Sequence, residues 1–239
     1  MASIKIFDSP ETLAEETAKN FISLTKKISA VKKNVSIALS GGNTPKLLFR
    51  ILLEKYSGDA EWSKYIFYWV DERCVPPSSS ESNFGEADRI LFCRLKISID
   101  KYRMKGEDDP EKEALRYGNL LKKNLPDKNG FPEFDLIMLG MGDDGHTASI
   151  FPGQLELMSS NSICAVSFNP INLQKRLTLT GKVINNAANI FFLVTGKSKS
   201  AIIGDVFKKT EKSFEFPVSY IKDDDTVIWF LDKEATSLL

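Results

Sequence analysis

The chain has 239 residues, of which 42% are hydrophobic, and its 32 basic and 32 acidic side chains give a formal net charge of zero. A chain of this length can bury a sizeable core without a disulfide or metal, and we expect one domain over residues 1–239. The balanced charge argues against nucleic acid and anionic membranes as partners, so any anionic ligand would have to be held by local groups.

The cysteines and the amino-terminal residues indicate where the protein works. Cys74, Cys93 and Cys164 are far apart and without CxxC spacing, which is typical of reduced thiols rather than of a disulfide framework or zinc site. Residues 1–8 lack the basic and long apolar segments of a signal peptide, and no stretch approaches the roughly 18 to 20 apolar residues of a membrane span. We therefore expect a cytoplasmic protein.

Short apolar runs alternate with segments of helical periodicity along the chain. Strands are predicted at 4–7, 35–39, 66–70, 136–139, 163–166, 177–179, 190–194 and 227–231. Helices are predicted at 10–31, 44–56, 110–125 and 198–208. The segment 96–134 is expected to contain helices only and no chemistry. This alternation predicts an α/β fold, a three-layer α/β/α sandwich around a mainly parallel, Rossmann-like sheet.

Ligands bind beyond the carboxyl ends of the strands in such sheets, so the residues after each strand are the candidates for a site. The strand at 35–39 is followed by Ser40, Gly41, Gly42, Asn43, Thr44 and Pro45. Glycines let backbone amides approach a ligand, Thr44 is suited to cap the next helix, and a helix N-terminus attracts anions. An ordinary tight turn remains the alternative. Without a Walker lysine or GxGxxG, nucleotide binding is not supported.

Charged residues follow the strand at 66–70. Asp71, Glu72 and Arg73 could orient hydroxyl groups, assist a proton transfer or bind phosphate, since arginine binds phosphate in a bidentate manner. The alternative is a solvated loop. The adjoining Pro/Ser-rich stretch, 76–82, is predicted to be an active-site loop.

The segment after the strand at 136–139 is the most informative. Residues 139–153 contain four glycines and His146, the only histidine of the chain. Asp144 lies two residues before it and could orient the imidazole or stabilise its charged form. A base with a pKa near neutrality can take a proton from water. A Ser-His-Asp triad is not assigned, because GxSxG is absent.

Two further cations complete the candidate site. Arg176 precedes the strand at 177–179, and Lys199 follows the strand at 190–194. Each alone could be an ordinary surface charge. With the loop after the strand at 35–39 they would form a phosphate clamp if the fold brings them together.

These motifs together resemble the 6-phosphogluconolactonase family. The resemblance rests on SGGNTP at 40–45, DERCVP at 71–76, Ser82 with Asn83, and GMGDDGHTASIFPG at 140–153, with RLTLT at 176–180 and GKSK at 196–199. It covers almost the whole chain. Glucosamine-6-phosphate deaminase shares the SGGxTP and DGH elements, but it has a carboxylate where this chain has Phe151 and a tyrosine where it has Arg73. Rival interpretations are such a deaminase or isomerase and a non-catalytic sugar-phosphate sensor.

The resemblance implies hydrolysis of 6-phospho-D-glucono-1,5-lactone to 6-phospho-D-gluconate in the oxidative pentose phosphate pathway. It implies His146 as general base, Asp144 as support for the imidazole, and amides near Gly41 or Gly142 as oxyanion donors. The residues expected to bind phosphate or hydroxyl groups are Ser40, Gly41, Gly42, Asn43, Thr44, Asp71, Glu72, Arg73, Gly142, Arg176 and Lys199. No metal or organic cofactor is expected, the only partner expected is the sugar-phosphate lactone, and no oligomeric state is predicted.

Overall fold

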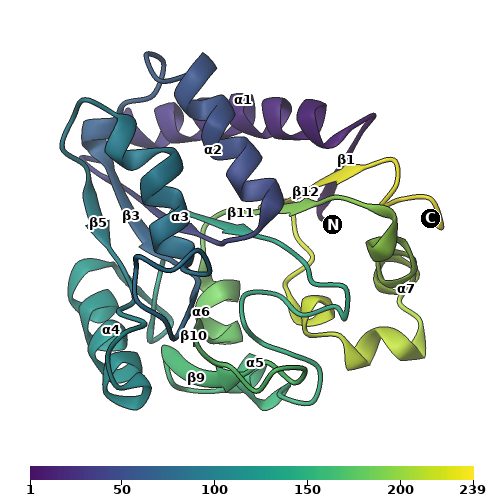
Figure 1. Cartoon of the computed structure of the whole chain (residues 1–239). Coiled ribbons are helices and arrows are strands. Elements are labelled where there is room, and N and C mark those ends of the chain that lie inside the picture. The colour runs from purple at the N-terminus through teal and green to yellow at the C-terminus, as the bar shows by residue number, and fades with distance from the viewer.

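A seven-stranded parallel sheet forms the centre of the computed structural model, which describes residues 1–239 (Figure 1). Its strand order is β1-β12-β11-β8-β2-β3-β5. The strands are β1 Ser3–Phe7, β2 Val35–Leu39, β3 Tyr65–Trp69, β5 Asp100–Tyr102, β8 Leu136–Leu139, β11 Ile190–Val194 and β12 Val227–Asp232. The three central strands β11, β8 and β2 are buried along their whole length, and their sequences are apolar except for Ser36 in β2, as expected for strands covered on both faces.

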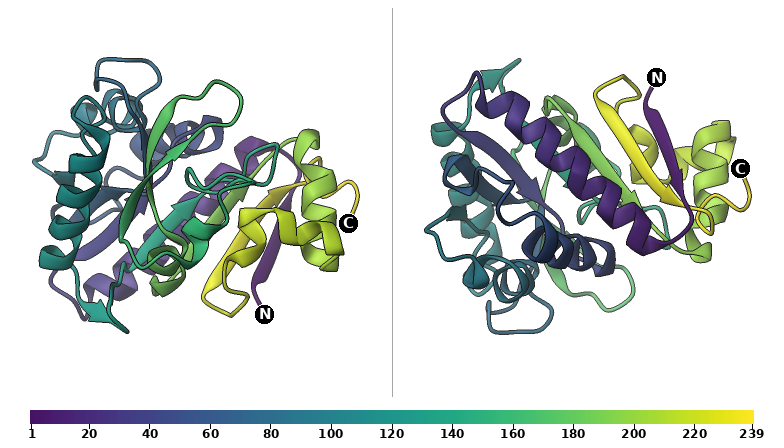
Figure 2. Two further views of the ribbon diagram at one scale, coloured as in Figure 1. Left: turned by 90° about the horizontal axis from the view of Figure 1, so that it is seen from below. Right: turned by 90° about the horizontal axis from the view of Figure 1, so that it is seen from above.

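Helices cover both faces of this sheet (Figures 1 and 2). One face packs against α1 Pro10–Ser29, α2 Asn43–Lys55 and α3 Asn83–Ile90. The other packs against α4 Pro110–Asn124, α5 Glu156–Ser159, α6 Gly181–Asn186 and α7 Ser200–Lys208. Side chains alternate between the faces, so Ile37 and Leu39 enter the first core and Ala38 the second. The predicted three-layer α/β/α sandwich with a mainly parallel, Rossmann-like sheet is confirmed.

A separate antiparallel sheet departs from one prediction. The segments 163–166 and 177–179 do not join the parallel sheet; they belong to β9 Cys164–Phe168 and β10 Lys175–Leu179, which pair with β4 Asp71–Arg73 in the order β4-β10-β9. One residue, Val70, connects β3 to β4. This short connection places β10 beside the carboxyl end of β3, where ligands bind in such folds.

The segment 96–134 was expected to contain helices only, and this prediction is wrong. Besides α4 it contains β5 and the hairpin of β6 Asp127–Lys128 and β7 Phe131–Pro132. These strands have two or three residues and few apolar side chains, so they carry no periodic signal. Single turns of 3-10 helix lie at Trp62–Lys64, Phe92–Arg94, Lys197–Lys199, Glu211–Glu215 and Pro217–Tyr220. None of the helices combines the length and apolar character that crossing a membrane requires.

Candidate active site

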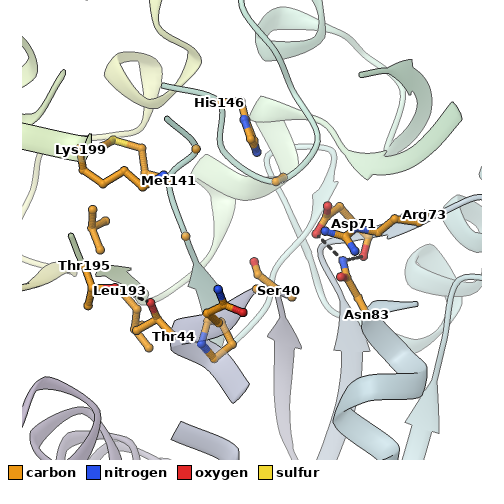
Figure 3. Close-up of a pocket in the computed structure, with 18 residues that line it drawn as sticks. Ser40, Thr44, Asp71, Arg73, Asn83, Met141, His146, Leu193, Thr195 and Lys199 are labelled. Carbon is orange, nitrogen blue, oxygen red and sulfur yellow. Dashed lines mark hydrogen bonds between the residues drawn. The ribbon is translucent and has the colours of Figure 1, made fainter. Parts of the chain in front are cut away.

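A polar cavity of about 280 Å³ lies beyond the carboxyl ends of β2, β3, β8 and β11 (Figure 3). Eighteen residues line it, and only four of them are hydrophobic. They come from segments that are far apart in sequence: the loop after β2, strand β4, the start of α3, the loop after β8 and the end of β11 with the turn that follows. The fold therefore brings most of the residues predicted from strand ends to one place.

The loop after β2 lines the cavity from Ser40 to Thr44 and gives α2 an open N-terminus. The helix begins at Asn43, with Gly42 as its N-cap at φ 109°, and no side chain caps it. The predicted cap, Thr44, shares a hydrogen bond of 2.9 Å with the hydroxyl of Thr195 instead. The amides of Gly41 and Gly42 donate no hydrogen bond within the protein. This loop therefore offers free N–H donors to an anion or an oxyanion.

Asp71 and Asn83 form one wall of the cavity. The buried carboxylate of Asp71 accepts from the Ser149 hydroxyl at 2.6 Å and from the Asn83 amide at 3.2 Å. Asn83 also donates to the Asp71 carbonyl at 3.0 Å. A side chain on Gly41 would overlap with the Asn83 amide, so the glycine is needed where the loop after β2 meets α3. Asn83 was not predicted as a site residue. The motif Ser82 with Asn83, which is part of the family resemblance, is the sequence feature that could have indicated it.

Glu72 does not line the cavity, although it was predicted to bind substrate. Its side chain is buried, and its two carboxylate oxygens accept hydrogen bonds from four donors. These donors are the Ser82 hydroxyl and the backbone amides of Arg73, Asn83 and Phe84, at 2.7 to 2.9 Å. Three of them belong to the start of α3 or its cap. Alternation along β4 turns Glu72 away from the face of Asp71 and Arg73, and it fixes α3 to that strand.

His146 lines the cavity from the loop after β8 (Figure 3), and its imidazole is hydrogen-bonded to Asp144. Nδ1 of the imidazole lies 2.5 Å from Oδ1 of Asp144, which also accepts from the His146 amide at 3.1 Å. The ring packs against Phe151 at a centroid distance of 4.6 Å. Because Asp144 accepts the proton on Nδ1, the lone pair lies on Nε2, which has no hydrogen-bond partner in the protein. Nε2 is therefore free to accept a proton.

Burial raises the pKa of the Asp144 carboxyl, but the hydrogen bond and charge of His146 act in the opposite direction. The net effect is a pKa below the ordinary value, so the carboxylate stays ionised beside the imidazole. The pair can therefore stabilise the imidazolium that forms when Nε2 accepts a proton.

Gly142 lines the cavity beneath this pair. Its own amide donates to the His146 carbonyl at 2.9 Å and is therefore not free to bind an oxyanion. A side chain at Gly142 would overlap with the imidazole and with the Asp144 carboxylate. The absence of a side chain at this position lets the turn close tightly under the ring.

Arg73 and Arg176 lie directly opposite each other on β4 and β10. Arg176 is only 8% exposed, and the Nε atoms of both residues are buried without a hydrogen-bond partner. Neither guanidinium forms an ion pair. Burial and the charge of Arg73 lower the pKa of Arg176, with opposition from Asp71. Two adjacent guanidiniums with unsatisfied donors favour an anion between them. Arg73 lines the cavity, and Arg176 is not one of the lining residues but is the neighbour of Arg73 on the adjacent strand.

Lys199 lines the cavity from the turn that follows β11. Its ammonium lies 2.5 Å from Oδ1 of Asp143, and its side chain is 16% exposed. Thr195 and Leu193, at the end of β11, line the same wall and were not predicted, because apolar strand residues and a single threonine carry no signal in the sequence.

No group of three or more His, Cys, Asp and Glu side chains is arranged to hold a metal ion.

Comparisons with known proteins agree with these features. The sequence model of the family described as glucosamine-6-phosphate isomerases/6-phosphogluconolactonase matches residues 8–229. The chain is 43% identical to a 6-phosphogluconolactonase of Treponema pallidum over 171 residues, 71% of each chain, and 37% identical to that of Haemophilus influenzae over 236 residues, 98% of each.

Comparison of the fold with solved structures indicates the same family. The solved structure of a 6-phosphogluconolactonase from Trypanosoma brucei superposes with a TM-score of 0.87 at 26% identity, over 100% of this chain and 99% of that chain. These matches confirm the resemblance inferred from the motifs. The chain belongs to the glucosamine-6-phosphate isomerase/6-phosphogluconolactonase family.

Proposed function

We propose that this protein hydrolyses 6-phospho-D-glucono-1,5-lactone to 6-phospho-D-gluconate, with His146 as the general base. One observation carries the proposal. The free Nε2 of an Asp-supported imidazole belongs to the same cavity as the cationic side chains of Arg73 and Lys199 and the open amides of the loop after β2. A base and an anion-binding wall in one cleft are what hydrolysis of a phosphorylated ester requires.

The chemistry follows from these positions. Nε2 takes a proton from a water molecule while the water oxygen attacks C1 of the lactone. The oxyanion that forms at C1 accepts hydrogen bonds from the free amides of Gly41 and Gly42. The bond between C1 and the ring oxygen then breaks, and the imidazolium returns its proton to that leaving oxygen. The net result is ring opening by one water molecule, with His146 regenerated.

The other residues of the cavity hold the substrate. The phosphate is bound by the cations Arg73, Arg176 and Lys199 together with the loop from Ser40 to Thr44, and binding energy from this remote group orients C1. The sugar hydroxyls bind to Asp71 and Asn83. The Asp71 carboxylate accepts hydrogen bonds, and the Asn83 side-chain amide can both donate and accept them. Ser40 contributes its position rather than its hydroxyl, which donates to the Met138 carbonyl at 2.7 Å.

Phe151 favours lactone hydrolysis over amino-sugar deamination. Its ring packs against His146 at the position where the deaminase motif supplies a carboxylate. An aromatic ring cannot exchange a proton with the imidazole, so one acid-base group of amino-sugar ring opening is missing.

Turnover of freshly generated lactone tests the proposal. We expect acid release well above the spontaneous hydrolysis of the lactone, which must be measured in parallel, and no ammonia release from glucosamine 6-phosphate. Ammonia release would support the deaminase, and tight lactone binding without turnover would support a sensor. Either result would replace the proposed reaction.

Arg176→Met is expected to reduce kcat/KM for the phosphorylated lactone about tenfold, because it removes one charged hydrogen-bonding group from the phosphate. Methionine keeps much of the buried stem volume of arginine, so the fold should be retained. Steady-state rates on the phosphorylated and the unphosphorylated lactone provide the measurement, and thermal melting is the control for folding. Equal losses on both lactones would show that Arg176 does not recognise the phosphate.

Two expectations from the sequence are kept as parts of this proposal: residues 1–239 form a single domain, and the reaction takes place in the cytoplasm. The single seven-stranded sheet, which contains strands from β1 to β12, supports the first expectation. The three free cysteines support the second.

A further inference from the structure

Asp143 links the loop after β8 to the turn after β11 by two hydrogen bonds. Its Oδ1 accepts from the Ser198 hydroxyl at 2.6 Å and lies 2.5 Å from the Lys199 ammonium. Asp143 belongs to the loop after β8 that carries the general base, whereas Ser198 and Lys199 belong to the turn after β11. Its side chain is 72% exposed and does not line the cavity. The catalytic pair does not use it.

A separate contact, with the end of β12, fixes the backbone of the turn after β11. Asp232, at the end of β12, is buried, and its two carboxylate oxygens accept from the Gly196 amide at 3.0 Å each. This contact fixes where the turn begins, but it does not touch the Lys199 side chain. The only polar partner of the Lys199 ammonium in the protein is Asp143.

The loop on the other side is also rigid. The Gly142 amide donates to the His146 carbonyl, the Val218 amide donates to the Gly145 carbonyl at 3.2 Å, and the Thr147 hydroxyl donates to the Gly140 carbonyl at 3.0 Å. Asp143 therefore projects from a fixed loop toward a flexible lysine. A bond of this kind restricts the rotamers of a long side chain before the ligand arrives.

We propose that Asp143 is a positioning residue that holds the Lys199 ammonium over the cavity and sets its place relative to His146. The inference rests on the proposed role of Lys199 in binding the anionic group of the substrate. A lysine ammonium has three donors, so it can keep its bond to Asp143 and still bind an anion. Hydrogen bonds from Lys199 and Ser198 lower the pKa of Asp143, which keeps it charged at neutral pH.

Asp143 has two opposite effects on anion binding: it positions Lys199, and its charge repels the anion. The exposure of its side chain determines which effect is larger. A carboxylate close to Lys199 could in principle repel the phosphate. Because the Asp143 side chain is 72% exposed and does not line the cavity, the high dielectric constant of water weakens its repulsion of an anion inside. Its short-range bonds to Lys199 and Ser198 are affected less, so loss of positioning is the larger effect of removing it.

Asp143→Ala tests this inference. We expect the KM for the phosphorylated lactone and the inhibition constant of inorganic phosphate to rise about three- to tenfold, with kcat changed less than twofold. Asp143→Asn keeps an oxygen that accepts from Ser198 and Lys199, so it should recover most of the loss. The control is Glu15→Ala, which breaks a 2.6 Å ion pair with Lys55 between α1 and α2, away from the cavity.

Lys199→Met separates failure of this inference from failure of the proposed function. If Lys199→Met raises the KM and the inhibition constant of phosphate but Asp143→Ala does not, the positioning role is wrong while the role of Lys199 stands. The same conclusion follows if Asp143→Ala binds phosphate more tightly than the wild type. If Lys199→Met itself leaves both constants unchanged, Lys199 does not bind the anionic group and the inference fails with it. An equal loss in Asp143→Asn and Asp143→Ala would also contradict the positioning role, because the bonds that asparagine keeps would then have no effect.

Discussion

His146→Ala is expected to lower kcat by about 10²- to 10⁴-fold, the usual contribution of a general base. The side chain is partly exposed, and its one hydrogen-bonded side-chain partner, Asp144, is also partly exposed, so its removal leaves no buried group unsatisfied. Circular dichroism and thermal melting should therefore match the wild type. Turnover must be measured after subtraction of the spontaneous reaction. A variant with near wild-type kcat would show that another group activates the water.

The pH dependence provides a second measure of the same role. Wild-type kcat/KM is expected to fall at acid pH as Asp144 loses its charge, because a neutral carboxyl group no longer stabilises the imidazolium. The pKa of Asp144 is lowered, so the carboxylate stays ionised through its ordinary titration range and loses its charge only as the pH falls through that lowered value. The residual activity of His146→Ala should lack the acid limb seen in the wild type. Retention of that limb would assign it to a different group.

Gly142→Ala is expected to reduce kcat by about 10²-fold, because misplacement of a catalytic group by roughly 1 Å can cost this much. A methyl group at this position overlaps with the His146 ring and the Asp144 carboxylate, so the pair must move. Binding of the phosphate should change little, since Arg73 and Lys199 lie on other elements. Separate values of kcat and KM, with a crystal structure of the variant, provide the measurement.

Gly140→Ala is the matched control for Gly142→Ala. It lies two residues earlier in the same loop, its φ is in the ordinary negative region, and the nearest atom to an added methyl group is the Leu193 carbonyl oxygen at 4.0 Å. Gly140 also lines the cavity, but an added methyl group there overlaps with neither His146 nor Asp144, so kcat should fall much less than in Gly142→Ala. If both variants lost activity equally, general intolerance of the loop rather than displacement of the imidazole would explain the result.

The parallel sheet could be predicted because its inner strands are buried on both faces and two of them are continuous apolar runs, Leu136–Leu139 and Ile190–Val194. The antiparallel sheet could not. Strand β4 consists of Asp71, Glu72 and Arg73, three charged residues that resemble a loop in sequence. They are held in a strand by pairing with β10 and by buried hydrogen bonds of their carboxylates, which are tertiary contacts.

The same limit applies to the candidate site. Position after a strand identified Ser40 and Lys199 correctly as cavity residues, because the topology of a parallel sheet brings strand ends together. It could not separate Asp71 from Glu72, since the two differ only in the face of β4 on which they lie. Nor could it show that Arg176 would lie opposite Arg73, because that depends on the register between β10 and β4.

The pairing of β1 with β12 has a consequence for synthesis of the chain. Ser3 to Phe7 lie beside Ile228 to Asp232, so β1 is made long before the strand that is its only neighbour in the sheet. Until β12 has been made, the backbone donors and acceptors of β1 have no partner in the sheet, and β11 also lacks one neighbour. The inner strands β2, β3 and β8 can pair earlier, whereas this side of the sheet can close only after β12 has been made.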